Sequence, residues 1–221
     1  AFDETEDQLF AQYLDKVRRY RRGDLRAEAR GAAHWQWQWN DIVSDLAGYL
    51  PFRTFPILYG WEDTVYQPVA SFTEELQEKT YEWAVTASAG GNSGNAWGST
   101  SDYPANDQQA LFFSHFGSYL GDWDQSDNYL RAPLGQKDWG LTSFWGARPN
   151  THYHSMVIDT SIGESMRRSL YYGSFDGNNL YGISAANYSN LLHIGLMGDP
   201  TLRRHIIAPP SNLVVVDNGG T

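Results

Sequence analysis

The stretch ALFFSHFG, residues 110–117, predicts the centre of the fold. It is a nearly continuous apolar run that stops at a glycine, and such runs are typical of strands covered on both faces in a parallel sheet. YEWAVTASAG at 81–90 and GLTSFWGA at 140–147 have the same strand-like character, and helix-like segments lie between the runs. Strands that alternate with helices predict an α/β fold, with a mainly parallel sheet flanked by helices.

Cap signals at both ends predict a helix from about Thr5 to Arg22. Thr5 and Gln8 have the spacing of a capping box, and Gly23 lies where a C-terminal cap belongs. The basic cluster within this helix, KVRRYRR at 16–22, is expected to be a solvated helix face.

Four other segments have local patterns. SFTEELQEK at 71–79 favours a helix, as does the apolar periodicity of residues 155–173. FPILYG at 55–60 is interpreted as a strand, and GGNSGNAWGSTS at 90–101 as a flexible surface loop. The loop lacks the lysine and the glycine spacing of phosphate-binding loops, so no nucleotide cofactor is expected there.

Composition restricts the classes of function. The chain has 221 residues and a formal net charge of −10, which argues against a nucleic-acid partner because phosphate binding needs a concentrated basic surface. It contains no cysteine, so disulfides, thiolate metal sites and cysteine nucleophiles are excluded. No apolar stretch is long enough to span a bilayer, so no membrane span is expected.

Five motifs suggest a family. They are QLFAQYLDKVRRYRRGD at 8–24, GSYLGDWD at 117–124, LRAPL at 130–134, GLTSFWGARP at 140–149 and HIGLMGDPTLRRH at 193–205. Together they resemble the gingipain-like group of caspase-fold cysteine peptidases. The resemblance implies a caspase/gingipain-like three-layer sandwich over residues 1–206. This region would be the C-terminal portion of the family's catalytic domain. It is expected to be incomplete at its N-terminus, because the family's first strands would lie upstream of Ala1.

The resemblance also implies a setting. PPSNL at 209–213 is similar to the start of a fibronectin type III module, so residues 207–221 are expected to be a linker or the first strand of such a module. The chain would then belong to a larger secreted or cell-surface bacterial protein. Its expected partners are upstream and downstream segments of the same precursor, another protein, or further copies of itself.

The resemblance places two residues at the family's catalytic positions. Ser118 stands where the nucleophilic cysteine ends a buried strand, and Gly91 stands where the catalytic histidine lies on an earlier loop. A serine hydroxyl needs a base to accept its proton, and glycine supplies none. His115 is no substitute, because its odd spacing from Ser118 puts the two side chains on opposite faces of a strand. The double departure predicts a non-catalytic domain that acts in binding, scaffolding or assembly.

Two alternatives remain open. In the first, the chain is an active hydrolase with Ser118 as nucleophile and His152 or His154 as base. Both histidines follow the next predicted strand, and Asp124 or Glu164 would orient the base. In the second, acidic and aromatic surfaces build a homomeric assembly at the cell surface.

Asp122, Asp124 and Asp127 form an acidic turn after Ser118. Carboxylate oxygens are ligands for Ca²⁺, and the resemblance implies calcium because gingipain-like domains carry it. The spacing lacks the glycine and final glutamate of an EF-hand loop, and such turns commonly satisfy their own backbone. The sequence therefore leaves Ca²⁺ as a candidate ion for this turn, and no other cofactor is expected.

Overall fold

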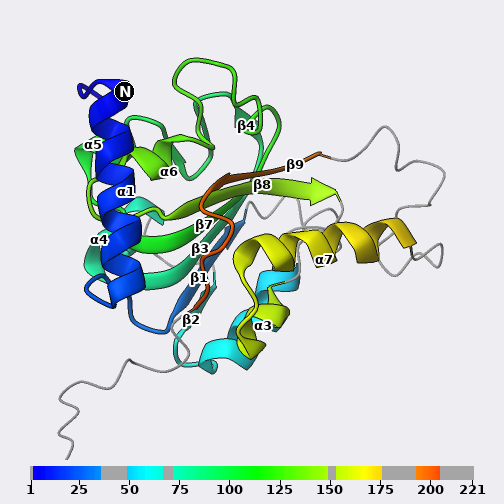
Figure 1. The fold of residues 1–221 in the computed structure, drawn as a ribbon. Coiled ribbons are helices and arrows are strands. Elements are labelled where there is room, and N and C mark those ends of the chain that lie inside the picture. Colours follow the sequence, from blue (N-terminus) through cyan, green and yellow to red (C-terminus); the bar gives the residue numbers. More distant parts are fainter. Residues whose placement is uncertain (1, 36–48, 67–71, 149–152, 176–192, 205–221) are drawn as a thin grey trace, which may run out of the picture.

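The computed structural model describes residues 2–35, 49–66, 72–148, 153–175 and 193–204, and its centre is a six-stranded sheet of order β2-β1-β3-β7-β8-β9 (Figure 1). The strands are β1 (Gly31–Trp35), β2 (Thr64–Tyr66), β3 (Tyr81–Ala87), β7 (Ala110–Phe116), β8 (Thr142–Arg148) and β9 (His193–Gly198). The first five strands of that order are parallel, and β9 pairs antiparallel with β8. The expected mainly parallel α/β sheet is confirmed.

Helices cover both faces of the sheet and complete three layers. One face carries α1 (Glu6–Arg22), α3 (Tyr49–Tyr59), α7 (Ile162–Phe175) and the 3-10 helix η2 (His154–Ile158), and the other carries α4 (Phe72–Glu78), α5 (Asp102–Ala105) and α6 (Ala132–Gly135). Trp83 and Phe112 face the first group of helices, whereas Ala84 and Phe113 face the second. The alternation of side chains along buried strands therefore supplies two separate cores.

The predicted first helix is confirmed together with its caps. The Thr5 hydroxyl accepts a hydrogen bond from the Gln8 backbone N–H at 3.4 Å, and the Gln8 side chain accepts one from the Thr5 backbone N–H at 2.8 Å. Gly23 ends the helix in the left-handed conformation, with φ 79°. Both caps satisfy backbone groups that a helix end leaves without a partner.

Lys16 corrects the expectation of a solvated basic face. The side chain is fully buried, and its ammonium group donates to the carbonyls of Leu134, Gln136 and Trp139 at 2.8, 2.7 and 2.6 Å. Burial lowers the pKa of Lys16 from 10.5 to about 7, a shift that the nearby carboxylate of Asp138 opposes. Lys16 thus ties α1 to the segment that follows α6.

The interpretation of residues 55–60 as a strand is wrong, because this segment belongs to α3 even though Pro56 lies inside the helix. Phe55, Leu58 and Tyr59 all pack on the core, at the spacing of one helix face. Phe55 lies directly over Gly31 of β1, where a Cβ atom would come within 2.4 Å of its ring. Packing of these side chains against the sheet therefore favours a helix over a strand in this segment.

Three further segments refine the sequence interpretation. The helical pattern at 155–173 divides into η2 and α7, because Asp159 between them has φ 64°. The family's first strands were expected to lie upstream of Ala1. The structure has two strands, β1 and β2, ahead of β3 in the chain. The domain boundary near residue 206 and the segment 207–221 lie outside the described residues.

Candidate functional site

Two glycines bring the carboxyl ends of β3 and β7 together. Ala87 and Phe116 are register partners, and the Ser88 N–H donates to the Phe116 carbonyl at 3.1 Å. Beyond them, a Cβ atom on Gly90 would lie 3.2 Å from Gly117 Cα, and one on Gly117 would lie 3.3 Å from Gly90 Cα. Because the backbones approach this closely, the turn after β7 and the loop after β3 form one site, as expected at the carboxyl edge of a parallel sheet.

Ser118 lies on the solvent side of this contact. Ser118 and Tyr119 are exposed, and the next residue, Leu120, is fully buried. Tyr119 has φ 61°, a conformation that is uncommon for a residue with a side chain and is often found at functional sites. The Trp145 indole N–H holds the turn by donating to the Gly117 carbonyl at 2.9 Å. The serine hydroxyl is therefore presented at the end of a buried strand.

Gly91 lies next to Gly90, in the loop that contacts the Ser118 turn. Apart from the adjacent residues, no atom in the described part of the chain lies within 4 Å of the position that a Cβ atom would take on Gly91. The position has room for a side chain and carries none. The structure thus sets Gly90, the chain neighbour of Gly91, against the Ser118 turn.

The loop at 90–101, expected to be flexible, forms a small antiparallel sheet of β4 (Gly90–Gly91), β5 (Gly94–Asn95) and β6 (Gly98–Ser99). The Asn95 amide donates to the Thr86 hydroxyl at 3.0 Å, and that hydroxyl bonds His115 Nδ1 at 2.9 Å. A hydroxyl has one donor and two acceptor sites, so Thr86 can bond both side chains at once. This chain anchors the small sheet to β3 and β7.

His115 has no part in activating Ser118. It is fully buried, with Nδ1 bonded to Thr86 and Nε2 bonded to the Tyr103 hydroxyl at 3.4 Å. Burial lowers its pKa from 6.5 to about 3, so the ring stays neutral. Its role in the fold is to hold the loop above the strand ends.

His34 is a buried histidine that the sequence interpretation did not single out. It lies in register with Thr86 on β3, which in turn pairs with His115 on β7. Its ring is edge-on to Phe72 and Trp97, and neither of its nitrogens has a hydrogen-bond partner among the described residues. Burial lowers the pKa of His34 from 6.5 to about 3.

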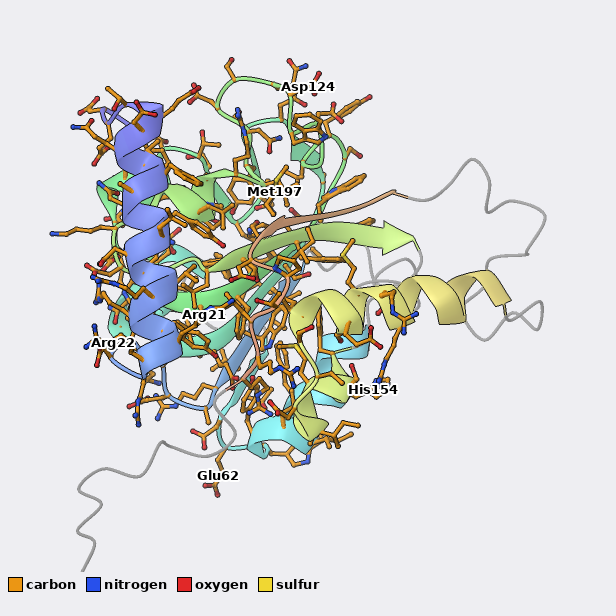
Figure 2. The ribbon with its side chains drawn as sticks, viewed as in Figure 1. Arg21, Arg22, Glu62, Asp124, His154 and Met197 are labelled. Carbon is orange, nitrogen blue, oxygen red and sulfur yellow. The ribbon has the colours of Figure 1, made fainter. Side chains whose placement is uncertain are left out.

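The structure does not support either proposed base, His152 or His154, as a neighbour of Ser118 among the residues it describes. His154 is exposed at the start of η2, whose Met156 packs in the core on the α3 and α7 face, whereas Leu120 beyond Ser118 packs in the opposite core. Figure 2 shows His154 beside α3 and α7, away from the loop that carries Asp124. His152 lies outside the described residues.

Glu164 and Asp124, the two carboxylates proposed to orient the base, make other contacts or lie exposed. Glu164 accepts hydrogen bonds from Arg167 and Arg168 at 2.6 and 2.8 Å, and these bonds lower its pKa from 4.5 to about 2. Asp124 is exposed in the turn after β7. Neither carboxylate has a hydrogen bond to a histidine among the contacts described here.

The side-chain amide of Asn128 stabilises the acidic turn through hydrogen bonds to the turn's backbone carbonyls. Asp122, Asp124 and Asp127 are exposed, and the Asn128 side chain donates to the carbonyls of Leu120 and Asp122 at 3.0 and 3.1 Å. Within the described ranges, no group of three or more histidine, aspartate or glutamate side chains could hold a metal ion. The calcium site stays a prediction.

Comparison with known proteins supports the fold at this point. No family model matches the chain, and no curated protein matches it. A solved structure titled "Structure of Protease" matches 96% of this chain with a TM-score of 0.59 and 14% identity. The fold is protease-like. The match covers 57% of that protease chain, so this chain spans less than two thirds of its length.

None of the described helices has the length and apolar character needed to cross a bilayer.

Proposed function

We propose that this chain is a non-catalytic, gingipain-like domain of a larger exported bacterial protein, and that it acts in binding or assembly. The protease-like fold supports the first part of the proposal. The observation that carries it is the contact of Gly90 with Gly117 and with the Ser118 carbonyl oxygen, which sets the loop that carries Gly91 against the Ser118 turn. A glycine at position 91 supplies no base.

Chemistry explains why this arrangement is inert. A serine hydroxyl becomes a nucleophile only when a neighbouring group takes its proton. Three histidines have described side chains: His34 and His115 are buried within the core, and His154 belongs to the opposite helical layer. Loss of a catalytic member costs about three to six powers of ten in rate. An unassisted Ser118 is therefore expected to have no useful rate of acyl transfer.

The surroundings of Ser118 suit binding. Tyr119 and Trp123 are 65% and 60% exposed in the same turn. Exposed aromatic side chains contribute large contact areas at protein interfaces. Asp122 and Asp124 lie on either side of Trp123 and are exposed too. We therefore place the binding surface on this acidic, aromatic turn.

A reactivity test decides between the inert domain and the active hydrolase. A fluorophosphonate probe, which labels activated serines, is expected to label the wild-type chain no more than Ser118→Ala. Labelling of the wild type that Ser118→Ala abolishes would establish the hydrolase instead. His152→Ala and His154→Ala would then identify its base.

A second test rebuilds the site. Ser118→Cys combined with Gly91→His places a thiol and an imidazole at the two positions, and Gly91 has room for the ring. Iodoacetamide is expected to alkylate the double variant at neutral pH at least about tenfold faster than Ser118→Cys alone, because an adjacent imidazole lowers a thiol pKa. Equal rates in two folded variants would contradict the assignment of Gly91.

A further inference from the structure

One side of α1 carries exposed apolar residues between an acidic end and a basic end. Phe10 and Leu14 are 63% and 52% exposed. Asp7 precedes Phe10 by three residues and Arg18 follows Leu14 by four, so the four side chains share one side of the helix. Acidic residues near the start and basic residues near the end also suit the dipole of the helix itself, but that dipole gives no reason for exposed apolar residues between them.

A groove of about 750 Å³ runs along the first half of α1. Leu9 and Phe10 of α1 and Met197 of β9 supply apolar lining, and the carboxylates of Glu6 and Asp127 outnumber the one cation among the described lining residues, Arg131. In Figure 2, Met197 appears between α1 and the loop that carries Asp124. The groove therefore fits a helix that offers an apolar side chain next to a cation.

The second half of α1 offers that combination. Leu14 is exposed, and Arg18 follows it one turn later and is exposed as well. Arg18 pairs with Asp15 on the same helix at 2.6 Å, with the two side chains 65% and 48% exposed. Exposed pairs of this kind contribute little, so Arg18 can exchange this partner for another carboxylate.

We propose that two copies of this chain pair through α1, antiparallel about a twofold axis. In this pairing Phe10 of each copy lies against Leu14 of the other, and Glu6 of each lies opposite Arg18 of the other. A twofold interface repeats every contact, so both grooves are filled. A parallel pairing would set Glu6 against Glu6, and like charges disfavour it.

The expected dimer is weak. Each copy contributes only one helix side and a groove, and we expect them to bury less than the roughly 800 Å² per partner of a standard interface. Charge complementarity then mainly selects the orientation of the two helices. Association should depend on protein concentration and weaken as salt screens the Glu6–Arg18 pairs.

Sedimentation velocity of the full 221-residue chain tests the pairing. Phe10→Glu is expected to raise the dimer dissociation constant at least about tenfold, as removal of a central aromatic does. Glu6→Arg and Arg18→Glu should each weaken the dimer about three- to tenfold. The double variant should return to within about threefold of wild type, because each reversed charge then meets a reversed partner.

Glu78→Arg is the matched control, since Glu78 is exposed on α4, on the other side of the sheet. It makes the same charge change and should leave association unchanged. Thermal unfolding of every variant checks that α1 still folds. A wild-type chain that stays monomeric into the millimolar range, or a double variant no better than the single ones, would overturn the proposal. The pairing rests on α1 and its groove alone, so its failure would leave the Ser118 assignment untouched.

Discussion

Gly90 lies against Gly117 where β3 and β7 end, and a Cβ atom on Gly90 would come within 3.2 Å of Gly117 Cα. This contact holds the small sheet that carries Gly91 against the turn that carries Ser118. Neither residue has a positive φ, so the close approach itself is what requires glycine. The backbone of the candidate site therefore depends on two residues that have no chemistry of their own.

Gly90→Ala and Gly91→Ala test this dependence as a matched pair. A methyl group at Gly90 would lie 2.9 Å from the Ser118 carbonyl oxygen, whereas one at Gly91 meets nothing within 4 Å. We expect Gly90→Ala to lower the free energy of unfolding by about 1–3 kcal/mol, and Gly91→Ala to change it by less than about 0.5 kcal/mol. Urea denaturation measures both. Equal effects would mean that the contact does not constrain the fold.

Lys16→Met should destabilise the chain strongly. The substitution keeps most of the side-chain volume but leaves the carbonyls of Leu134, Gln136 and Trp139 without their donor. We expect a loss of about 2–4 kcal/mol, since unsatisfied buried acceptors are costly. Arg18→Met, on the exposed side of the same helix, is the control and should change stability by less than about 0.5 kcal/mol. A small effect of Lys16→Met in urea denaturation would contradict the buried role.

Lys16 should also make stability depend on alkaline pH. Burial lowers its pKa in the folded chain to about 7, while the unfolded chain keeps a value near 10.5. Between these values the unfolded chain binds more protons, so the free energy of unfolding contributed by this group rises with pH. The slope should reach up to about 1.4 kcal/mol per pH unit. Urea denaturation from pH 7 to 10 should show this slope in wild type but not in Lys16→Met, and parallel curves would refute it.

Thr86→Val and Thr142→Val form a second matched pair. Both threonines are buried on strands. The Thr86 hydroxyl links Asn95 to His115, whereas the Thr142 hydroxyl has no hydrogen-bond partner in the segments that the structure describes. We expect Thr86→Val to cost about 1–3 kcal/mol and to speed amide exchange in residues 90–99. Thr142→Val should be neutral or stabilising, because it removes an unsatisfied group. Hydrogen exchange followed by mass spectrometry checks both, and unchanged exchange in Thr86→Val would rule out the anchoring role.

Strong local signals predicted several elements correctly. The apolar runs at 81–90, 110–117 and 140–147 correspond to β3, β7 and β8, and the caps at Thr5 and Gly23 bound α1. These signals depend on neighbouring residues, which is why they can be recognised without the rest of the fold. The strand HIGLMG at 193–198 was not predicted, because its glycines weaken the pattern and its pairing with β8 joins distant segments.

The site was predictable only in part. The position of Ser118 at the end of a strand followed from the apolar run before it. The contact of Gly90 with Gly117 did not, because only the register of two parallel strands brings these residues together. The bond from Trp145 to the Gly117 carbonyl could not be predicted for the same reason.

By itself, the sequence determined the α/β class, the first helix, the three central strands and the absence of a thiol nucleophile. The tertiary structure alone decided that residues 55–59 are helical, that Lys16 is buried, and that Gly90 lies against the Ser118 turn. Caps and apolar runs act between near neighbours in the chain. Close approach and burial instead depend on how distant segments pack, and that packing exists only once the sheet has formed.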